Sequence, residues 1–74
     1  MKNKLLVCFG QKVRQERLLK KYTQEELANL AGVHRTYIGM IERGEKNITL
    51  ENIAKIAKAL NSSISKMLED VGNE

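Results

Sequence analysis

The stretch TQEELANLAGVHRTYIGMIERG, residues 23–44, predicts two short helices joined by a tight turn. Thr23 and Glu26 form a capping box, in which the threonine hydroxyl accepts a hydrogen bond from the Glu26 amide and the Glu26 side chain accepts one from the Thr23 amide. Gly32 can adopt the left-handed backbone conformation that ends a helix, and Gly44 can do the same after Arg43. We therefore expect one helix at residues 24–30 and the next at residues 34–42.

Two helices of about two turns, separated by about three to four residues that include a glycine, form the helix-turn-helix pattern. Ala28 supports this interpretation, because two helices that cross steeply at close range need a small side chain near their contact. Val33 and Ile38 can fill the wedge behind the turn. The same features also fit a plain five-helix bundle, and that alternative stays open.

Apolar residues recur at intervals of three and four along the rest of the chain, which contains no proline, and this periodicity indicates helices. Thr49 is a suitable N-cap for a further helix, and Asn61, Ser62 and Ser63 separate that helix from a last one. The sequence therefore predicts a single all-α domain over residues 1–74 with five helices, at 4–20, 24–30, 34–42, 50–60 and 63–70.

The composition favours an anionic partner. The chain of 74 residues carries 13 Lys and Arg against 9 Asp and Glu, which gives a formal net charge of +4 and a pI near 9.4. Such a balance favours polyanions such as nucleic acid or an acidic membrane surface. A chain of this length holds one domain at most and leaves no room for a separate substrate domain.

Cys8 is the only cysteine, so an internal disulfide is excluded and the cytoplasm is the expected compartment. The opening MKNKLLVCFG imitates a secretion signal, but its apolar run from Leu5 to Phe9 is shorter than the roughly 7 to 15 residues of a signal core. We interpret it as the first turn of a helix. No apolar run in the sequence is long enough to span a membrane.

The segment TQEELANLAGVHRTYIGMIERGEKNITLENIAKIAKAL, residues 23–60, resembles the lambda-repressor-like, or XRE, family of helix-turn-helix proteins. Within that family, HRTYI together with IERGEKNITL is most similar to the controller proteins of restriction-modification systems. These are small single-domain dimers that regulate transcription of their own gene and of the endonuclease gene. The resemblance implies a five-helix, lambda-repressor-like DNA-binding domain, and the short chain leaves out the separate dimerisation or cleavage domain of longer repressors.

Base reading is expected at the start of the second helix of the motif, because helix-turn-helix proteins place these residues against base edges in the major groove. Arg35 can donate two parallel hydrogen bonds to O6 and N7 of guanine, although a contact to phosphate or water is the alternative. Thr36 offers a hydroxyl to a base and a methyl group to thymine. His34, at the expected N-cap, and Met40 are the other two expected base-reading residues. Neither Gly39 nor Met40 can make a directional hydrogen bond to a base, so readout is expected to rest mainly on Arg35 and Thr36.

Phosphate contacts are expected on both sides of these residues. The N-terminus of the first helix of the motif is a natural anion site, and Gln24 resembles the family's glutamine that binds the DNA backbone and steadies the base-reading residues. The alternatives are that Arg43 and Lys46 are solvated charges and that Tyr37 partly serves the core. The expected phosphate-binding residues are Thr23, Gln24, Tyr37, Arg43, Lys46 and Asn47.

Arg17 and Glu42 match a further pattern of the family. In that pattern an arginine of the first helix pairs with the glutamate that ends the recognition helix. The resemblance therefore implies a structural ion pair that ties these two helices together.

An apolar strip near the C-terminus could pair two copies of the chain. Two-fold pairing through the last two helices, at about 50–70, would place the recognition helices about 34 to 36 Å apart, which is one DNA turn and matches a palindromic operator. The alternatives are an antitoxin or another protein-interaction module of the same fold, or a small phage-type repressor. RNA polymerase is a further candidate partner. The expected dimer interface consists of Leu50, Ile64, Met67, Leu68 and Val71.

Enzymatic chemistry is not expected. The string SISK at residues 63–66 matches a motif of certain acyl-transfer enzymes, but a chain of this length has no sheet to form their pocket. One histidine and one cysteine do not make a metal site. We therefore expect a protein that is not an enzyme and that needs no cofactor or metal.

Overall fold

The computed structural model describes residues 3–69 and 71–72, and these contain five α-helices and no strand. The first four helices begin and end within one residue of their predicted limits, which confirms the all-α prediction. None of the described helices combines the length and the apolar character needed to cross a membrane. The helices are α1 (Lys4–Leu19), α2 (Gln24–Ala31), α3 (Arg35–Glu42), α4 (Leu50–Ala59) and α5 (Ile64–Leu68).

The last helix is shorter than the sequence predicted. The prediction placed it at residues 63–70, whereas α5 ends at Leu68 and has Ser63 as its N-cap. Residue 70, where the predicted helix ended, lies outside the described residues.

Side-chain caps fix where the helices begin. At the start of α2 both halves of the capping box are formed: the Glu26 amide donates to Thr23 Oγ1 at 3.0 Å, and the Thr23 amide donates to Glu26 Oε1 at 2.8 Å. Asn3, Thr49 and Ser63 accept amide hydrogen bonds at the starts of α1, α4 and α5. These local bonds satisfy amides that a helix leaves without a partner inside itself, and they explain why the predicted helix starts lie within one residue of the observed ones.

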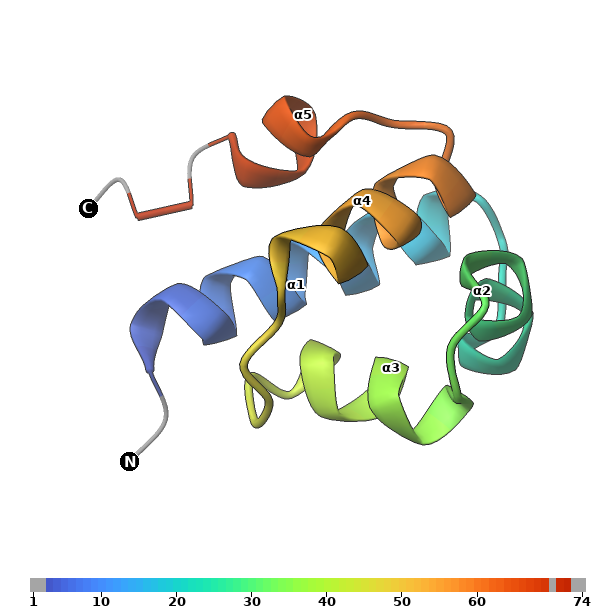
Figure 1. Cartoon of the computed structure of the whole chain (residues 1–74), viewed down its shortest axis with the longest axis horizontal. Coiled ribbons are helices and arrows are strands. Elements are labelled where there is room, and N and C mark those ends of the chain that lie inside the picture. The colour runs from blue at the N-terminus through green and yellow to red at the C-terminus, as the bar shows by residue number, and fades with distance from the viewer. Residues whose placement is uncertain (1–2, 70, 73–74) are drawn as a thin grey trace.

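The turn between α2 and α3 has the geometry of the helix-turn-helix motif. Gly32 ends α2 with φ at 73°, a left-handed conformation, and the Val33 amide donates to the carbonyl of Ala28 at 3.0 Å. Ala28 is 1% exposed and Ile38 is fully buried, so the two helices meet closely at a small residue. The chain therefore turns sharply and brings α3 across α2, as Figure 1 shows.

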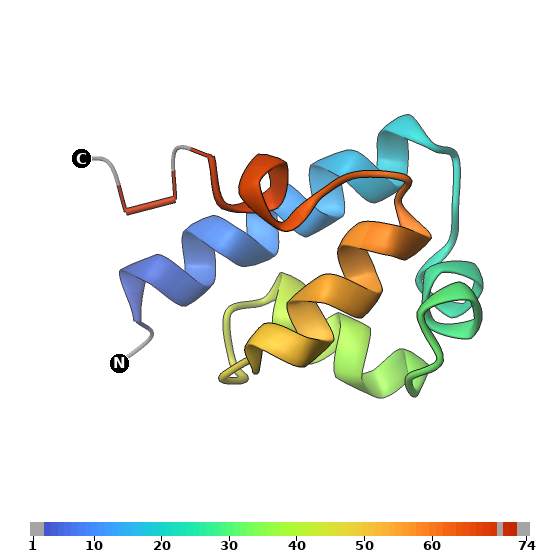
Figure 2. The same ribbon diagram turned by 45° about the horizontal axis from the view of Figure 1, so that its top comes forward.

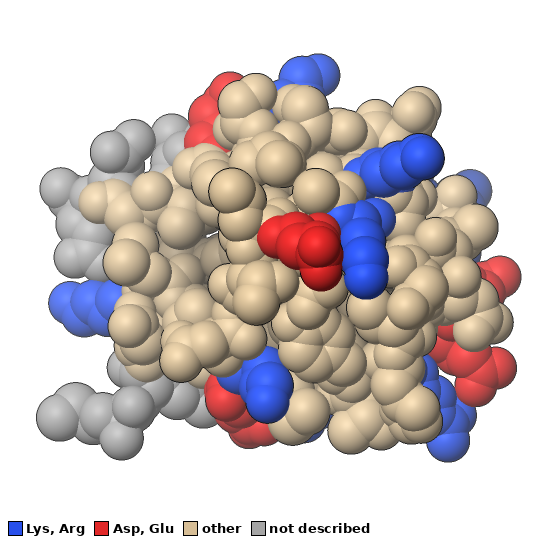
Figure 3. Space-filling model, viewed as in Figure 1, with Lys and Arg blue, Asp and Glu red and all other residues tan. Residues whose placement is uncertain are grey.

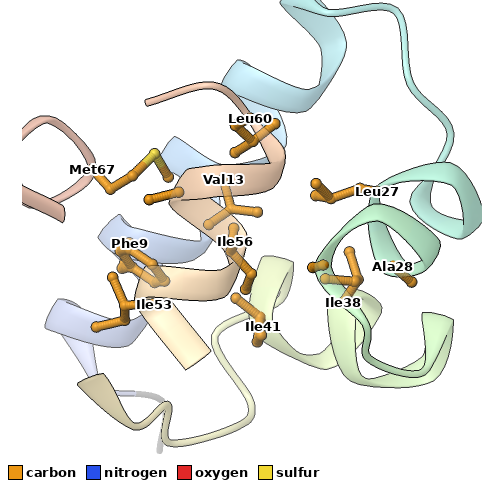
Figure 4. Packing of buried hydrophobic residues seen from close by; sticks show 12 residues of the cluster. Phe9, Val13, Leu27, Ala28, Ile38, Ile41, Ile53, Ile56, Leu60 and Met67 are labelled. Carbon is orange, nitrogen blue, oxygen red and sulfur yellow. The ribbon is translucent and has the colours of Figure 1, made fainter. Parts of the chain in front are cut away.

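The core lies between α4, α1 and the α2–α3 pair. Figures 1 and 2 show how the helices are arranged: α1 packs against α3, α2 packs against α3 and α4, and α5 packs against α4 and α1. In Figure 4 side chains from all these helices point into the space they enclose. The buried apolar side chains are those of Phe9, Val13, Leu27, Ala28, Ala31, Ile38, Ile41, Ile53, Ile56, Ala57, Leu60 and Met67.

Met67 was assigned to the dimer interface, and this assignment is wrong. Its side chain has no exposed surface and belongs to the core of the single chain, where α5 packs against α4 and α1. The residue follows the apolar period of a helix so short that periodicity could not separate its buried face from its exposed one. A charge at this position would therefore unfold the chain before it could affect a dimer.

Gly10 allows α1 to lie directly against the end of α3. A Cβ atom at this position would collide with the carbonyl oxygen of Ile41 and would lie 2.9 Å from that of Glu42. Because these oxygens belong to helix backbone, they could not move aside without shifting α3. The contact sets the distance between α1 and α3, and nothing in the sequence around Gly10 predicted it.

Candidate nucleic-acid interface

The first residues of α3 gather three of the predicted base-reading side chains on an exposed surface. His34 is the N-cap, and its Nδ1 accepts a hydrogen bond from the Thr36 amide at 3.1 Å, so in the neutral ring the proton is on Nε2. Arg35 and Thr36 are the first two residues of the helix, and all three side chains are exposed. An amide-accepting imidazole thus performs the capping role usually taken by Ser, Thr, Asp or Asn.

Polar groups lie over the next turn of α3, although Gly39 and Met40 themselves offer none to a base. Gly39 is buried, because the guanidinium of Arg43 and the amide of Gln24 lie over it. A Cβ atom at Gly39 would meet Arg43 Nη1 at 3.1 Å and Gln24 Oε1 at 3.7 Å. Met40 is half-buried beside this position. The missing side chain at residue 39 therefore leaves room for the amide of Gln24 from α2 and for the guanidinium of Arg43 from the end of α3.

A buried hydrogen-bond network holds α3 from behind. Arg17 donates from Nε to Glu42 Oε2 at 2.7 Å and from Nη2 to Glu42 Oε1 at 3.0 Å, and its Nη1 donates to the carbonyl of Tyr22 at 2.8 Å. The Arg17 and Glu42 side chains are only 9% and 3% exposed. The hydrogen bond to Glu42 raises the pKa of Arg17 above its ordinary value, although burial opposes this. The ion pair implied by the resemblance is therefore formed, with two parallel bonds.

Gln24 connects this network to the exposed surface. Its Nε2 donates to Glu42 Oε1 at 3.1 Å, so the same carboxylate oxygen accepts from α1 and from α2. The amide is half-buried, with its oxygen beside Gly39. Three helices thus meet at one carboxylate, and the first residue of α2 is fixed relative to α3.

Tyr37 is oriented by α4. Its ring is half-buried against the core, and its hydroxyl oxygen accepts a hydrogen bond from Asn52 Nδ2 at 2.9 Å. The hydroxyl proton remains available to an acceptor such as a phosphate oxygen. The role of Asn52 could not be predicted from the sequence, because no local pattern links residues fifteen apart on different helices.

The other expected phosphate-binding residues lie at the start of α2 and after the end of α3. Thr23 caps α2, and Arg43 Nε donates to Glu45 Oε1 at 3.0 Å. Lys46 and Asn47 are exposed in the loop between α3 and α4. Phosphate binding by these residues stays a prediction.

Four members of the apolar strip keep some accessible surface. Leu50 is 65% exposed and Leu68 is 37% exposed, whereas Ile64 and Val71 are half-buried against the core. Figure 3 shows the face on which α4 lies in front, and neutral side chains make up most of it, with basic and acidic groups scattered among them. Loss of Met67 leaves a smaller strip than the sequence predicted.

A family model described as helix-turn-helix matches residues 13–67, which cover the motif and the helices around it. The chain belongs to the XRE-type helix-turn-helix family. Family members are DNA-binding transcription regulators, and this chain is one of them. The predicted family and the predicted role as a DNA-binding transcription regulator are both confirmed.

Within this helix-turn-helix family, controller proteins are among the most similar relatives. Control protein C.BamHI of Bacillus amyloliquefaciens is 49% identical over 76 residues, which cover 99% of this chain and 94% of the relative. Control protein C.SmaI of Serratia marcescens is 47% identical over 73 residues, covering 89% and 87%. The crystal structure of the restriction-modification controller protein C.AhdI from Aeromonas hydrophila superposes with a TM-score of 0.82 at 45% identity, covering 84% of this chain and 94% of that one.

Proposed function

We propose that this helix-turn-helix protein is the controller of a restriction-modification system, and that it binds a palindromic operator as a homodimer. The observation that carries the proposal is the exposed start of α3, where Arg35 and Thr36 stand on a helix held from behind by the Arg17–Glu42–Gln24 network. Similarity to control proteins over almost the whole chain supports the assignment to a restriction-modification system.

In this proposal the start of α3 enters the major groove. Arg35 reads a guanine through two parallel hydrogen bonds, Thr36 contacts a neighbouring base, and His34 and Met40 line the same surface. The rigid network behind α3 matters because base contacts discriminate only when donors and acceptors are held in place before binding. Arg43 Nη1 and Gln24 Oε1, which lie over Gly39, add polar groups beside the base-reading residues.

Phosphate contacts would set the position of α3 in the groove. The start of α2, with Thr23 and Gln24, would bind one side of the groove. Tyr37, Arg43, Lys46 and Asn47 would bind the other.

A homodimer follows from the number of contacts that one chain can make. A monomer offers one recognition helix, whereas two helices about 34 to 36 Å apart read both halves of a palindrome. Leu50 and Leu68 expose apolar side chains on α4 and α5, and Ile64 and Val71 continue this surface. We propose these four residues as the dimer interface.

The rival proposal is a protein-interaction module of the same fold, such as an antitoxin, whose apolar strip binds a different protein. A small phage-type repressor is a second rival. RNA polymerase is a candidate partner for a controller that activates transcription. We expect the protein to act in the cytoplasm and to have no enzymatic activity.

A footprint on the DNA upstream of the protein's own gene, combined with sedimentation of the free protein, tests the proposal. A controller is expected to protect a site with two-fold symmetry and to sediment as a dimer at the concentrations that bind. A monomer with no preference for any sequence in that DNA would refute it and favour the interaction module. Methyltransferase and endonuclease genes beside this one would support a controller, whereas a neighbouring toxin gene would support an antitoxin.

A further inference from the structure

Arg35 is held by a glutamate from the other helix of the motif. Its Nη1 donates to Glu25 Oε2 at 3.1 Å, and the two side chains are 67% and 61% exposed. Glu25 is the second residue of α2 and Arg35 is the first residue of α3, so the bond spans the turn of the motif. The two side chains border a shallow hollow that Asn29, Val33 and His34 complete.

This bond leaves most of the guanidinium free for DNA. Arg35 has five N–H donors in a rigid plane, and the bond to Glu25 occupies one of its two terminal nitrogens. Nη2 and Nε therefore remain on the other edge, where two parallel hydrogen bonds to O6 and N7 of guanine can form. A flexible arginine would have to lose rotamer freedom at this step, and an arginine already held loses less.

The negative charge of Glu25 has a second effect. A carboxylate beside the DNA surface is repelled by phosphates, and it reduces the charge that Arg35 presents to any duplex, whatever its sequence. At a guanine the directed hydrogen bonds of Arg35 compensate for that repulsion, whereas random DNA offers no such compensation. Glu25 therefore weakens non-specific binding more than specific binding.

We propose that Glu25 is a positioning residue that sets the sequence specificity of Arg35. The proposal rests on the proposed function, since it needs Arg35 to read a base. A second arginine–glutamate pair, Arg43 with Glu45, provides a matched control, because it has the same chemistry at 3.0 Å at the far end of α3.

The experiment compares Glu25→Gln and Glu45→Gln with the wild type. Each protein is titrated on the operator duplex defined by the footprint and on a random duplex of the same length, at several salt concentrations. An exposed ion pair changes an equilibrium by about 1.4- to 5-fold. Because a dimer contains two such pairs, the ratio of operator affinity to random-DNA affinity is expected to fall by about 2- to 25-fold in Glu25→Gln. In Glu45→Gln both affinities should change together, so the ratio should stay at the wild-type value.

A further variant tests whether Glu25 acts through Arg35. In an Arg35→Ala background, adding Glu25→Gln should leave the affinity ratio unchanged, and chemical melts should show that both variants stay folded. The role of Glu25 would be overturned if Glu25→Gln kept the wild-type ratio of operator affinity to random-DNA affinity. It would also be overturned if Glu25→Gln lowered this ratio as much in the Arg35→Ala background as in the wild type. A wild type that prefers no sequence would instead refute the proposed function, so the two failures can be told apart.

Discussion

Replacing Glu42 with alanine should be among the most destabilising single changes in this chain. The substitution leaves the Arg17 guanidinium, 9% exposed, without the carboxylate that accepts two of its hydrogen bonds, and it also leaves Gln24 Nε2 without its acceptor. Breaking one side of a buried ion pair costs about 3 to 5 kcal/mol, because the remaining charge is buried without compensation. Water barely reaches the Arg17 and Glu42 side chains, so we expect a loss within this range.

The loss is large relative to the whole free energy of unfolding. At roughly 0.05 to 0.15 kcal/mol per residue, a domain of this size has about 4 to 11 kcal/mol. Urea denaturation followed by circular dichroism measures the difference. With a slope of about 1 kcal/mol per molar urea, the midpoint should fall by about 3 M or more, and Glu42→Ala could be partly unfolded without denaturant.

The double variant Arg17→Met with Glu42→Leu is the control. It removes both charges and fills their volume with apolar atoms, and such replacements are often neutral or stabilising. Here the Tyr22 carbonyl loses the donor Arg17 Nη1, which costs about 1 to 3 kcal/mol, and the half-buried Gln24 Nε2 loses its acceptor as it does in Glu42→Ala. The double variant should therefore lie between Glu42→Ala and wild type. A urea midpoint for Glu42→Ala within about 0.5 M of wild type would refute the reasoning, because the buried guanidinium would then need no partner.

Three further predictions concern packing, DNA reading and dimer formation. Gly10→Ala should destabilise the fold by about 1 to 3 kcal/mol despite the higher helix propensity of alanine, because its Cβ atom meets helix backbone; a urea melt equal to or above that of wild type would contradict this. Arg35→Ala should lose about 1 to 3 kcal/mol of operator affinity per half-site and should flatten the preference for one guanine position. Lys46→Ala should weaken binding to all DNA sequences alike and reduce the dependence of log affinity on log salt by about one. Equal losses of affinity for operator and random DNA in Arg35→Ala would show that Arg35 does not read a base. Leu50→Glu combined with Leu68→Glu should give a folded monomer with little operator affinity, and a monomer that still binds the full palindrome as tightly as wild type would assign this surface to another partner.

The sequence determined the local structure of this protein. Helix starts at Thr23 and Thr49 and the left-handed turn at Gly32 depend on hydrogen bonds and backbone angles within a few residues, and such short-range interactions can be read from neighbouring residue types. The spacing of apolar residues likewise placed Ile38 and Ile56 in the core. Arg17 and Glu42 could be paired before the structure only because they match a family pattern.

The tertiary structure decided which side chains from different helices meet. The collision that excludes a side chain at Gly10, the bond from Glu25 to Arg35 and the position of Gln24 over Gly39 all depend on how two helices cross. The burial of Met67 depends on how the short α5 lies against α4 and α1. No local pattern contains the angle or distance of a crossing, because both result from packing of the whole core at once. The sequence could therefore place the recognition helix in the chain, and only the packed helices could fix the surroundings of its side chains.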